Sequence, residues 1–106
     1  MIVEWEGKEY AYDPRLIDVR VATKINEYTG LGLRSWEKGV DDCNAKCLAA
    51  LLFAIKVQAG EPCHSIAALN FSALDFYDAI VQAAAKELAE KIEPEEVAET
   101  DPMVTA

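Results

Sequence analysis

The chain has 106 residues, of which 52% are hydrophobic, and it carries a formal net charge of −9. This length allows one small globular domain with one core. The acidic excess excludes nucleic acid as a partner, because affinity for a phosphate backbone comes mainly from lysine and arginine. The chain shows neither a signal peptide nor an apolar run long enough to span a bilayer, so we expect a cytoplasmic protein with no membrane partner.

The first segment, residues 2–13, predicts a β-hairpin. Two β-prone stretches flank Gly7 and Lys8, a pair suited to a two-residue turn with glycine first. This turn would place two apolar pairs on one face, namely Trp5 opposite Tyr10 and Val3 opposite Tyr12. Because an isolated hairpin is only marginally stable, we expect this face to pack on helices.

Two short helices are expected after the hairpin. The first spans residues 15–29, with Asp18 as the best N-cap and an apolar stripe at helical spacing. The second spans residues 33–38, carries Trp36, and ends at Gly39. An aromatic residue on such a helix is usually part of a small core.

The central element is a predicted helix over residues 41–60, with Asp41 or Asp42 as its N-cap. One face is the expected core seam, formed by Ala45, Leu48, Leu51, Leu52, Ile55 and Ala59. The opposite side carries a second apolar strip, formed by Ala49, Ala50, Phe53 and Val57 and bracketed by Lys46 and Lys56. A helix that is apolar on nearly all sides must be covered on nearly all sides. Either other elements of the domain cover the second apolar strip, or a partner does.

The last helix is expected from Ser72 to Pro94, after a single helical turn over residues 65–69. Its predicted inward stripe consists of Leu74, Tyr77, Val81, Ala84, Leu88 and Ile92. We therefore predict an α+β, mainly α, fold in which a hairpin packs on a small bundle of three to four helices. The domain would span residues 1–94, and residues 95–106 would form a flexible acidic tail.

The side chains most able to bind a metal ion or to react are those of three cysteines and one histidine. A four-ligand zinc site would use Cys43, Cys47, Cys63 and His64. Adjacent residues such as Cys63 and His64 cannot easily point at one ion, and an odd cysteine count without an export signal is typical of reduced thiols. We therefore expect no metal and no cofactor. No catalytic constellation is evident, and we expect the protein not to be an enzyme.

Three segments carry a resemblance to a known family. The hairpin segment WEGKEYAYD, the segment INEYTGLGLRSW and the helix AALLFAIKVQAG, followed by an acidic tail, resemble the tail assembly chaperones of long-tailed bacteriophages, particularly those that infect actinobacteria. The likeness covers roughly residues 3–95, and YTGLGLRSW is its most characteristic element. It implies a protein of the host cell cytoplasm that binds the hydrophobic tape measure protein and keeps it soluble while tail tube subunits polymerise around it.

The resemblance implies the tape measure protein as the main partner, with the tail tube protein and a second copy of the chain as further candidates. The candidate partner-binding residues are Trp36, Lys46, Ala49, Ala50, Phe53 and Val57. In this interpretation the second apolar strip is exposed in the monomer or covered only by self-association. Packing inside the core remains the alternative for these residues. The alternative function is a structural virion component, such as a tail or connector subunit, or another small acidic protein-interaction domain.

Overall fold

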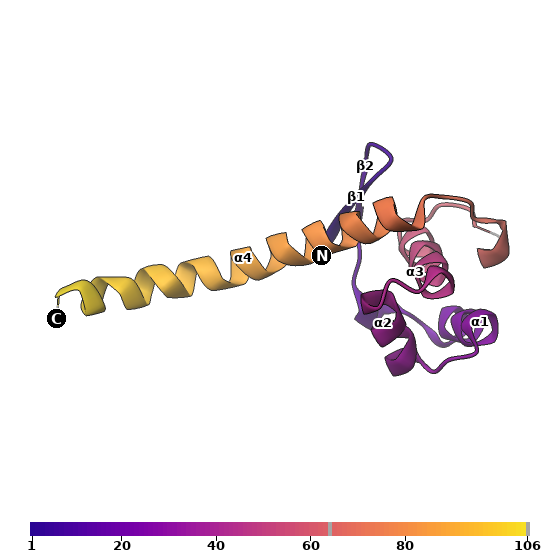
Figure 1. Ribbon diagram of the computed structural model, residues 1–106, viewed down its shortest axis with the longest axis horizontal. Coiled ribbons are helices and arrows are strands. Elements are labelled where there is room, and N and C mark those ends of the chain that lie inside the picture. Colours follow the sequence, from indigo (N-terminus) through magenta and orange to yellow (C-terminus); the bar gives the residue numbers. More distant parts are fainter. Residues whose placement is uncertain (64, 106) are drawn as a thin grey trace.

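The structure, a computed structural model, describes residues 1–63 and 65–105, with side chains described as far as residue 90. It has the predicted α+β, mainly helical, fold, in which an N-terminal hairpin packs on helices (Figure 1). Along the chain, the elements are β1 (Ile2–Trp5), β2 (Lys8–Ala11), the 3-10 turn η1 (Pro14–Leu16), α1 (Val19–Thr29), α2 (Leu33–Asp41), α3 (Ala45–Gln58), the 3-10 turn η2 (Ile66–Ala68) and α4 (Ala73–Thr105).

The hairpin closes through Glu6 and Gly7 rather than through Gly7 and Lys8. Both turn residues have positive φ, +51° and +76°, as a type I′ turn requires. The observed strand pairs include Val3 with Tyr10 and Trp5 with Lys8. The predicted register is therefore wrong by two residues. Because side chains alternate with a period of two, this shift keeps the predicted face inward, where the buried residues are Val3, Tyr10 and Tyr12.

The first helix, α1, begins where its capping residue predicts. The Asp18 carboxylate accepts a hydrogen bond from the Val21 N–H at 2.9 Å. The predicted start at residue 15 is wrong, because Pro14–Leu16 forms the separate turn η1, and Asp13 caps that turn. Asp13 and Asp18, five residues apart, therefore begin two different elements: Asp13 begins the short turn η1, and Asp18 begins the longer helix α1.

The next helix, α2, packs on α3 through a close contact at Gly39. The expectation that Gly39 ends the helix is wrong, because α2 continues to Asp41. A Cβ atom at Gly39 would overlap the Sγ atom of Cys47 on α3, so glycine allows the two helices to approach. One turn earlier, the indole N–H of Trp36 donates a hydrogen bond to the Cys47 carbonyl oxygen at 2.9 Å. Together these contacts fix α2 against the first turn of α3.

The central helix, α3, is buried along most of its length, as the sequence predicts. Every residue from Cys47 to Ile55 is buried, because α1, α2, β2, η2 and α4 all contact this helix. The predicted caps Asp41 and Asp42 are wrong. Instead, the side-chain oxygen of Asn44 accepts a hydrogen bond from the Cys47 N–H at 3.2 Å. The two aspartates belong to the end of α2.

The last helix, α4, lies along β1 and then runs on away from α1, α2 and α3 (Figure 1). Ser72 accepts a hydrogen bond from the Asp75 N–H at 3.3 Å, which confirms Ser72 as the capping residue. The rings of Phe71 and Phe76 meet edge to face with centroids 5.4 Å apart, and this contact bridges the start of the helix.

The sequence predicts that α4 ends at Pro94, but the helix reaches Thr105. A proline inside a helix removes one hydrogen bond, yet the glutamate and alanine residues on both sides of it favour the helical state. The predicted domain boundary at residue 94 therefore falls within α4. The flexibility predicted for residues 95–106 lies outside what the structure describes.

Candidate functional site

Three of the four residues of the second apolar strip, Ala49, Ala50 and Phe53, belong to the core. Ala50 and Phe53 are 0% and 1% exposed, and Ala49 and Trp36 are also buried. The predicted exposure of this strip is therefore wrong. The physical reason is that α1 and η2 pack over this side of α3. Elements of the same domain therefore cover the strip, and a partner is not needed to cover it.

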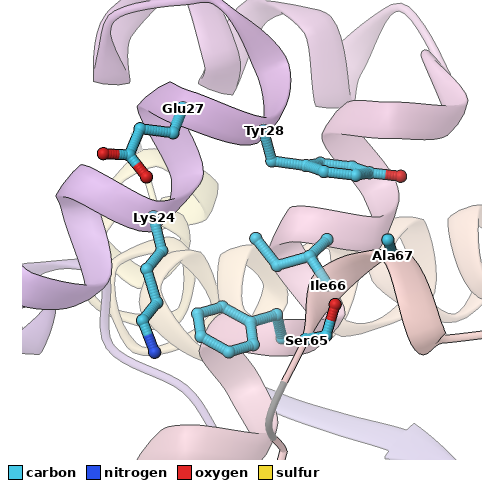
Figure 2. A pocket seen from close by; sticks show the side chains of 7 residues that line it. Lys24, Glu27, Tyr28, Ser65, Ile66 and Ala67 are labelled. Atoms are coloured by element: carbon cyan, nitrogen blue, oxygen red, sulfur yellow. The ribbon is translucent and has the colours of Figure 1, made fainter.

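The cover over Phe53 includes an open hollow of about 310 Å³ between α1, α3 and η2. Figure 2 shows Lys24, Glu27 and Tyr28 on α1 and the segment around Ile66 lining this hollow. The Lys24 ammonium lies 5.8 Å from the centroid of the Phe53 ring, within range of a cation–π contact. One cation and one carboxylate at the rim of an open hollow provide no catalytic arrangement among the residues that line it.

The remaining predicted binding residues are spread over separate places. Lys46 and Ala49 line a second hollow of about 200 Å³, and the Lys46 ammonium lies 5.8 Å from the Tyr28 ring centroid. Val57 is half-buried in a third hollow, between η1, α1 and the end of α3. Trp36 lies in the contact between α2 and α3. The structure therefore does not bring the six predicted residues together on one surface.

A different apolar surface is open, on α4. Leu74, Val81 and Leu88 are 69%, 47% and 58% exposed, although the sequence predicts that they face the bundle. We call the described residues of this row the α4 stripe: Leu74, Tyr77, Val81, Ala84 and Leu88. The sixth predicted member, Ile92, has a side chain outside the described part. The alternating spacing of three and four residues places all five on one face of the helix.

The orientation of α4 follows from its aromatic contacts. Phe76 is fully buried, and Ala83, two turns later, is buried on the same side. The Trp5 ring of β1 lies 5.1 Å from Phe76 and 6.1 Å from Phe71, both edge to face. The large Phe76 ring decides which face turns inward, and the smaller Leu74 and Val81 side chains turn outward.

Two polar contacts hold α4 in the same orientation. The Lys86 ammonium lies 3.4 Å from the Glu4 carboxylate on β1, and both side chains are largely exposed. The Tyr77 hydroxyl donates a hydrogen bond to the Asp41 carbonyl oxygen at 3.0 Å. The first contact marks the hairpin side of α4, and the second marks the side nearer the end of α2. The sequence alone indicated neither contact, because the partners are 82 and 36 residues apart.

Acidic residues border the α4 stripe near its start. Asp78 lies four residues after Leu74 and three before Val81, so it stands beside both on the helix surface. Asp41 and Asp42 end α2 where Tyr77 contacts it, and both are exposed. Asp78 therefore borders the open apolar surface, and the acidic end of α2 lies where Tyr77 contacts it.

The three described candidate zinc ligands, Cys43, Cys47 and Cys63, show no metal-binding arrangement. Within residues 1–63 and 65–90, the structure contains no group of three or more histidine, cysteine or acidic side chains placed to hold a metal ion. Burial raises the pKa of the Cys47 thiol, which disfavours the thiolate that zinc requires. Cys43 and Cys63 are partly exposed free thiols, and His64 lies outside the described residues.

The strongest electrostatic cluster joins the hairpin to the loop after α3. The Glu61 carboxylate pairs with the ammonium groups of Lys8 and Lys56. Hydrogen bonds from Lys8 and then from Tyr10 lower the pKa of Glu61 to about 2. No substrate-sized cavity adjoins these residues among the described hollows, and the cluster serves to attach β2 to α3.

Among the described residues, no helix is long and apolar enough to cross a membrane. Comparisons of the chain with protein-family models, with curated proteins and with solved structures found no match. The physical features of the α4 stripe are therefore the basis on which a function is proposed.

Proposed function

We propose that this protein is a tail assembly chaperone, which binds the hydrophobic tape measure protein in the infected cell and keeps it soluble while tail tube subunits assemble around it. The observation that carries the proposal is the exposed α4 stripe. The resemblance in sequence suggests the tape measure protein as the client, and the α4 stripe is an exposed apolar surface suited to binding it.

The α4 stripe has the pattern of a helix that binds another helix. Its large apolar side chains, Leu74, Val81 and Leu88, repeat every seven residues, and Tyr77 and Ala84 fill the positions between them. Contiguous apolar surfaces on soluble proteins usually mark interaction sites. A client helix that covers this face would bury the three large side chains together, as in recognition of one amphipathic helix by another apolar surface.

The charge of the chain suits the same task. A formal net charge of −9 on 106 residues keeps molecules apart through mutual repulsion. A complex that covers an apolar client with such a chain would keep that repulsion on its outer surface. The tail tube protein is a second partner in this proposal, because it must replace the chaperone on the client.

The test is co-expression of a tape measure fragment from the same genome with variants of the protein. Replacing Leu74, Val81 and Leu88 by serine removes the apolar anchors from the α4 stripe. We expect a large loss of soluble fragment and a small loss of stability from helix propensity, about 0.5 kcal/mol per site, because the three side chains are exposed. The matched control replaces three exposed residues elsewhere on α4, namely Gln82, Ala89 and Glu90, by serine.

Two results would contradict the proposal. The first is a triple variant that folds and keeps the fragment as soluble as the wild type does. The second concerns the alternative function: a structural virion component remains in the mature particle, whereas a chaperone leaves it. Mass spectrometry of purified particles that finds this chain in stoichiometric amounts would support the structural component.

A further inference from the structure

We propose that the α4 stripe takes an amphipathic helix whose apolar face is bordered by basic residues. This inference rests on the proposed function and narrows it, because it specifies the chemistry of the segment that is bound. It follows from the length of the stripe and from the charges around it.

The length of the α4 stripe fits about four helical turns. Leu74 and Leu88 are fourteen residues apart, which corresponds to about 21 Å along a helix axis. The large side chains lie one above another at two-turn intervals, with small or half-buried residues between them. A partner helix with apolar residues at the same three- and four-residue spacing would place its side chains between these anchors.

The charges beside the first half of the stripe are negative. Asp78 borders Leu74 and Val81 on one side, and Asp41 and Asp42 lie where Tyr77 contacts the end of α2. Rim charges of one sign select partners of the other sign and speed their association. Arginine or lysine beside the apolar face of the client would meet these carboxylates.

Two described lysines near α4, Lys46 and Lys86, have other contacts. Lys86 pairs with Glu4 on the hairpin side of the helix. Lys46 shares a hollow with Ala73 at the start of α4, but its ammonium lies over the Tyr28 ring. Neither cation neutralises Asp78 in an ion pair that the structure contains among residues 1–63 and 65–90.

A second copy of this chain is the occupant that the charges disfavour. Two α4 stripes paired in parallel would bring both sets of Asp41, Asp42 and Asp78 together, and in any pairing each chain carries a formal charge of −9. Like charges at an interface suppress that pairing. A basic-bordered helix removes the repulsion and gains attraction from the same residues.

The experiment compares two labelled peptides of eighteen residues by fluorescence anisotropy with the full chain. Both carry leucines at alternating spacings of three and four, and they differ only in lysine or glutamate at the flanking positions. We expect the lysine peptide to bind at least about tenfold more tightly at low salt, and the difference to shrink as salt screens the rim.

Two variants locate the effect on the protein. Replacing Asp41, Asp42 and Asp78 by asparagine should remove most of the preference for the lysine peptide. The matched control makes the same change in charge at exposed glutamates on other elements, namely Glu9, Glu27 and Glu37, each to glutamine, and should keep the preference. The asparagine variant leaves the three apolar anchors in place, so the neutralised chain should still bind tape measure fragments.

The outcomes separate this inference from the proposed function. Equal binding of both peptides, binding of neither, or the same preference in the asparagine variant overturns the inference, even where tape measure fragments stay soluble. A dimer in light scattering that dissociates when Leu74, Val81 and Leu88 become serine also overturns it, because a second copy is then the occupant. Selective binding of the lysine peptide by a chain that fails to solubilise tape measure fragments supports the inference and removes the chaperone function.

Discussion

The indole N–H of Trp36 donates a buried hydrogen bond of 2.9 Å to the backbone carbonyl oxygen of Cys47. It ties α2 to the first turn of α3, and Trp36 is among the largest fully buried side chains in the described core. Trp36 is therefore a structural residue that joins two helices, and not part of the partner surface that the sequence proposed.

Trp36→Phe should lower the free energy of unfolding by about 1–3 kcal/mol, because the change removes a buried hydrogen bond together with some apolar contact. Trp5→Phe is the matched control. The indole N–H of Trp5 is buried but has no hydrogen-bond partner among the described residues, so this change removes contact alone. Urea unfolding of both variants checks the expectation, and an equal loss in both would show that the Trp36 hydrogen bond contributes little.

Gly39→Ala should destabilise the protein, although alanine favours a helix interior by about 1 kcal/mol over glycine. The new methyl group would collide with the Cys47 Sγ atom and push α2 away from α3. Cys47→Ala should rescue Gly39→Ala, because it removes the colliding sulfur. Thermal melts of the two single variants and the double variant form the required cycle. Additive losses in that cycle would show that the two residues do not collide.

These two contacts show which parts of the fold were predictable. Local signals predicted the capping role of Asp18, the start of α4 at Ser72 and the burial of most of α3, because capping and hydrophobic density are encoded in adjacent residues. Gly39 carries the same local signal whether it ends a helix or permits a close contact. Only the close approach of Cys47 distinguishes the two roles, and that approach depends on the tertiary packing of α2 against α3.

The candidate site was the least predictable part for the same reason. The second apolar strip and the α4 stripe have similar apolar patterns, and the sequence does not say which one the domain covers. Packing of Trp5 on Phe76 turns Leu74 outward, and packing of α1 over α3 turns Phe53 inward. The orientations of Leu74 and Phe53 both depend on residues far away in the chain. The prediction from sequence therefore took the second apolar strip as exposed and the α4 stripe as buried, and the structure shows the reverse.

Phe53→Ala should cost about 3–5 kcal/mol of stability, because Phe53 is 1% exposed and its removal leaves a cavity. A chain of this size has a total stability of roughly 5–15 kcal/mol, so the variant should be close to unfolding. Leu88→Ala, on the α4 stripe, is the exposed counterpart and should cost far less. Similar melting temperatures for the two variants would show that Phe53 is not part of the core.

Glu61→Gln should weaken the protein at pH 7 and have no effect in strong acid. The pKa of Glu61 is lowered to about 2, chiefly by the hydrogen bond from Lys8, whereas an unperturbed carboxyl titrates near 4.5. A lowered carboxyl pKa stabilises the folded state at pH values above the unfolded pKa. This contribution is lost as the pH falls from about 4.5 to about 2.

Urea unfolding at several pH values, with Glu9→Gln as an exposed control, measures the Glu61 effect. The difference between wild type and Glu61→Gln should be largest near neutral pH and disappear near pH 2. A constant difference across this range would mean that the ion pairs with Lys8 and Lys56 do not stabilise the folded state.

Site-specific photo-crosslinking tests whether a client helix covers the α4 stripe. A photoreactive residue is placed at Val81 on the stripe or at Gln82, the exposed neighbour that points about 100° away around the helix. Each protein is then irradiated with a tape measure fragment. We expect a strong crosslink from position 81 and a weak one from position 82. Equal crosslinks from both positions, or a strong crosslink from position 82 alone, would contradict it.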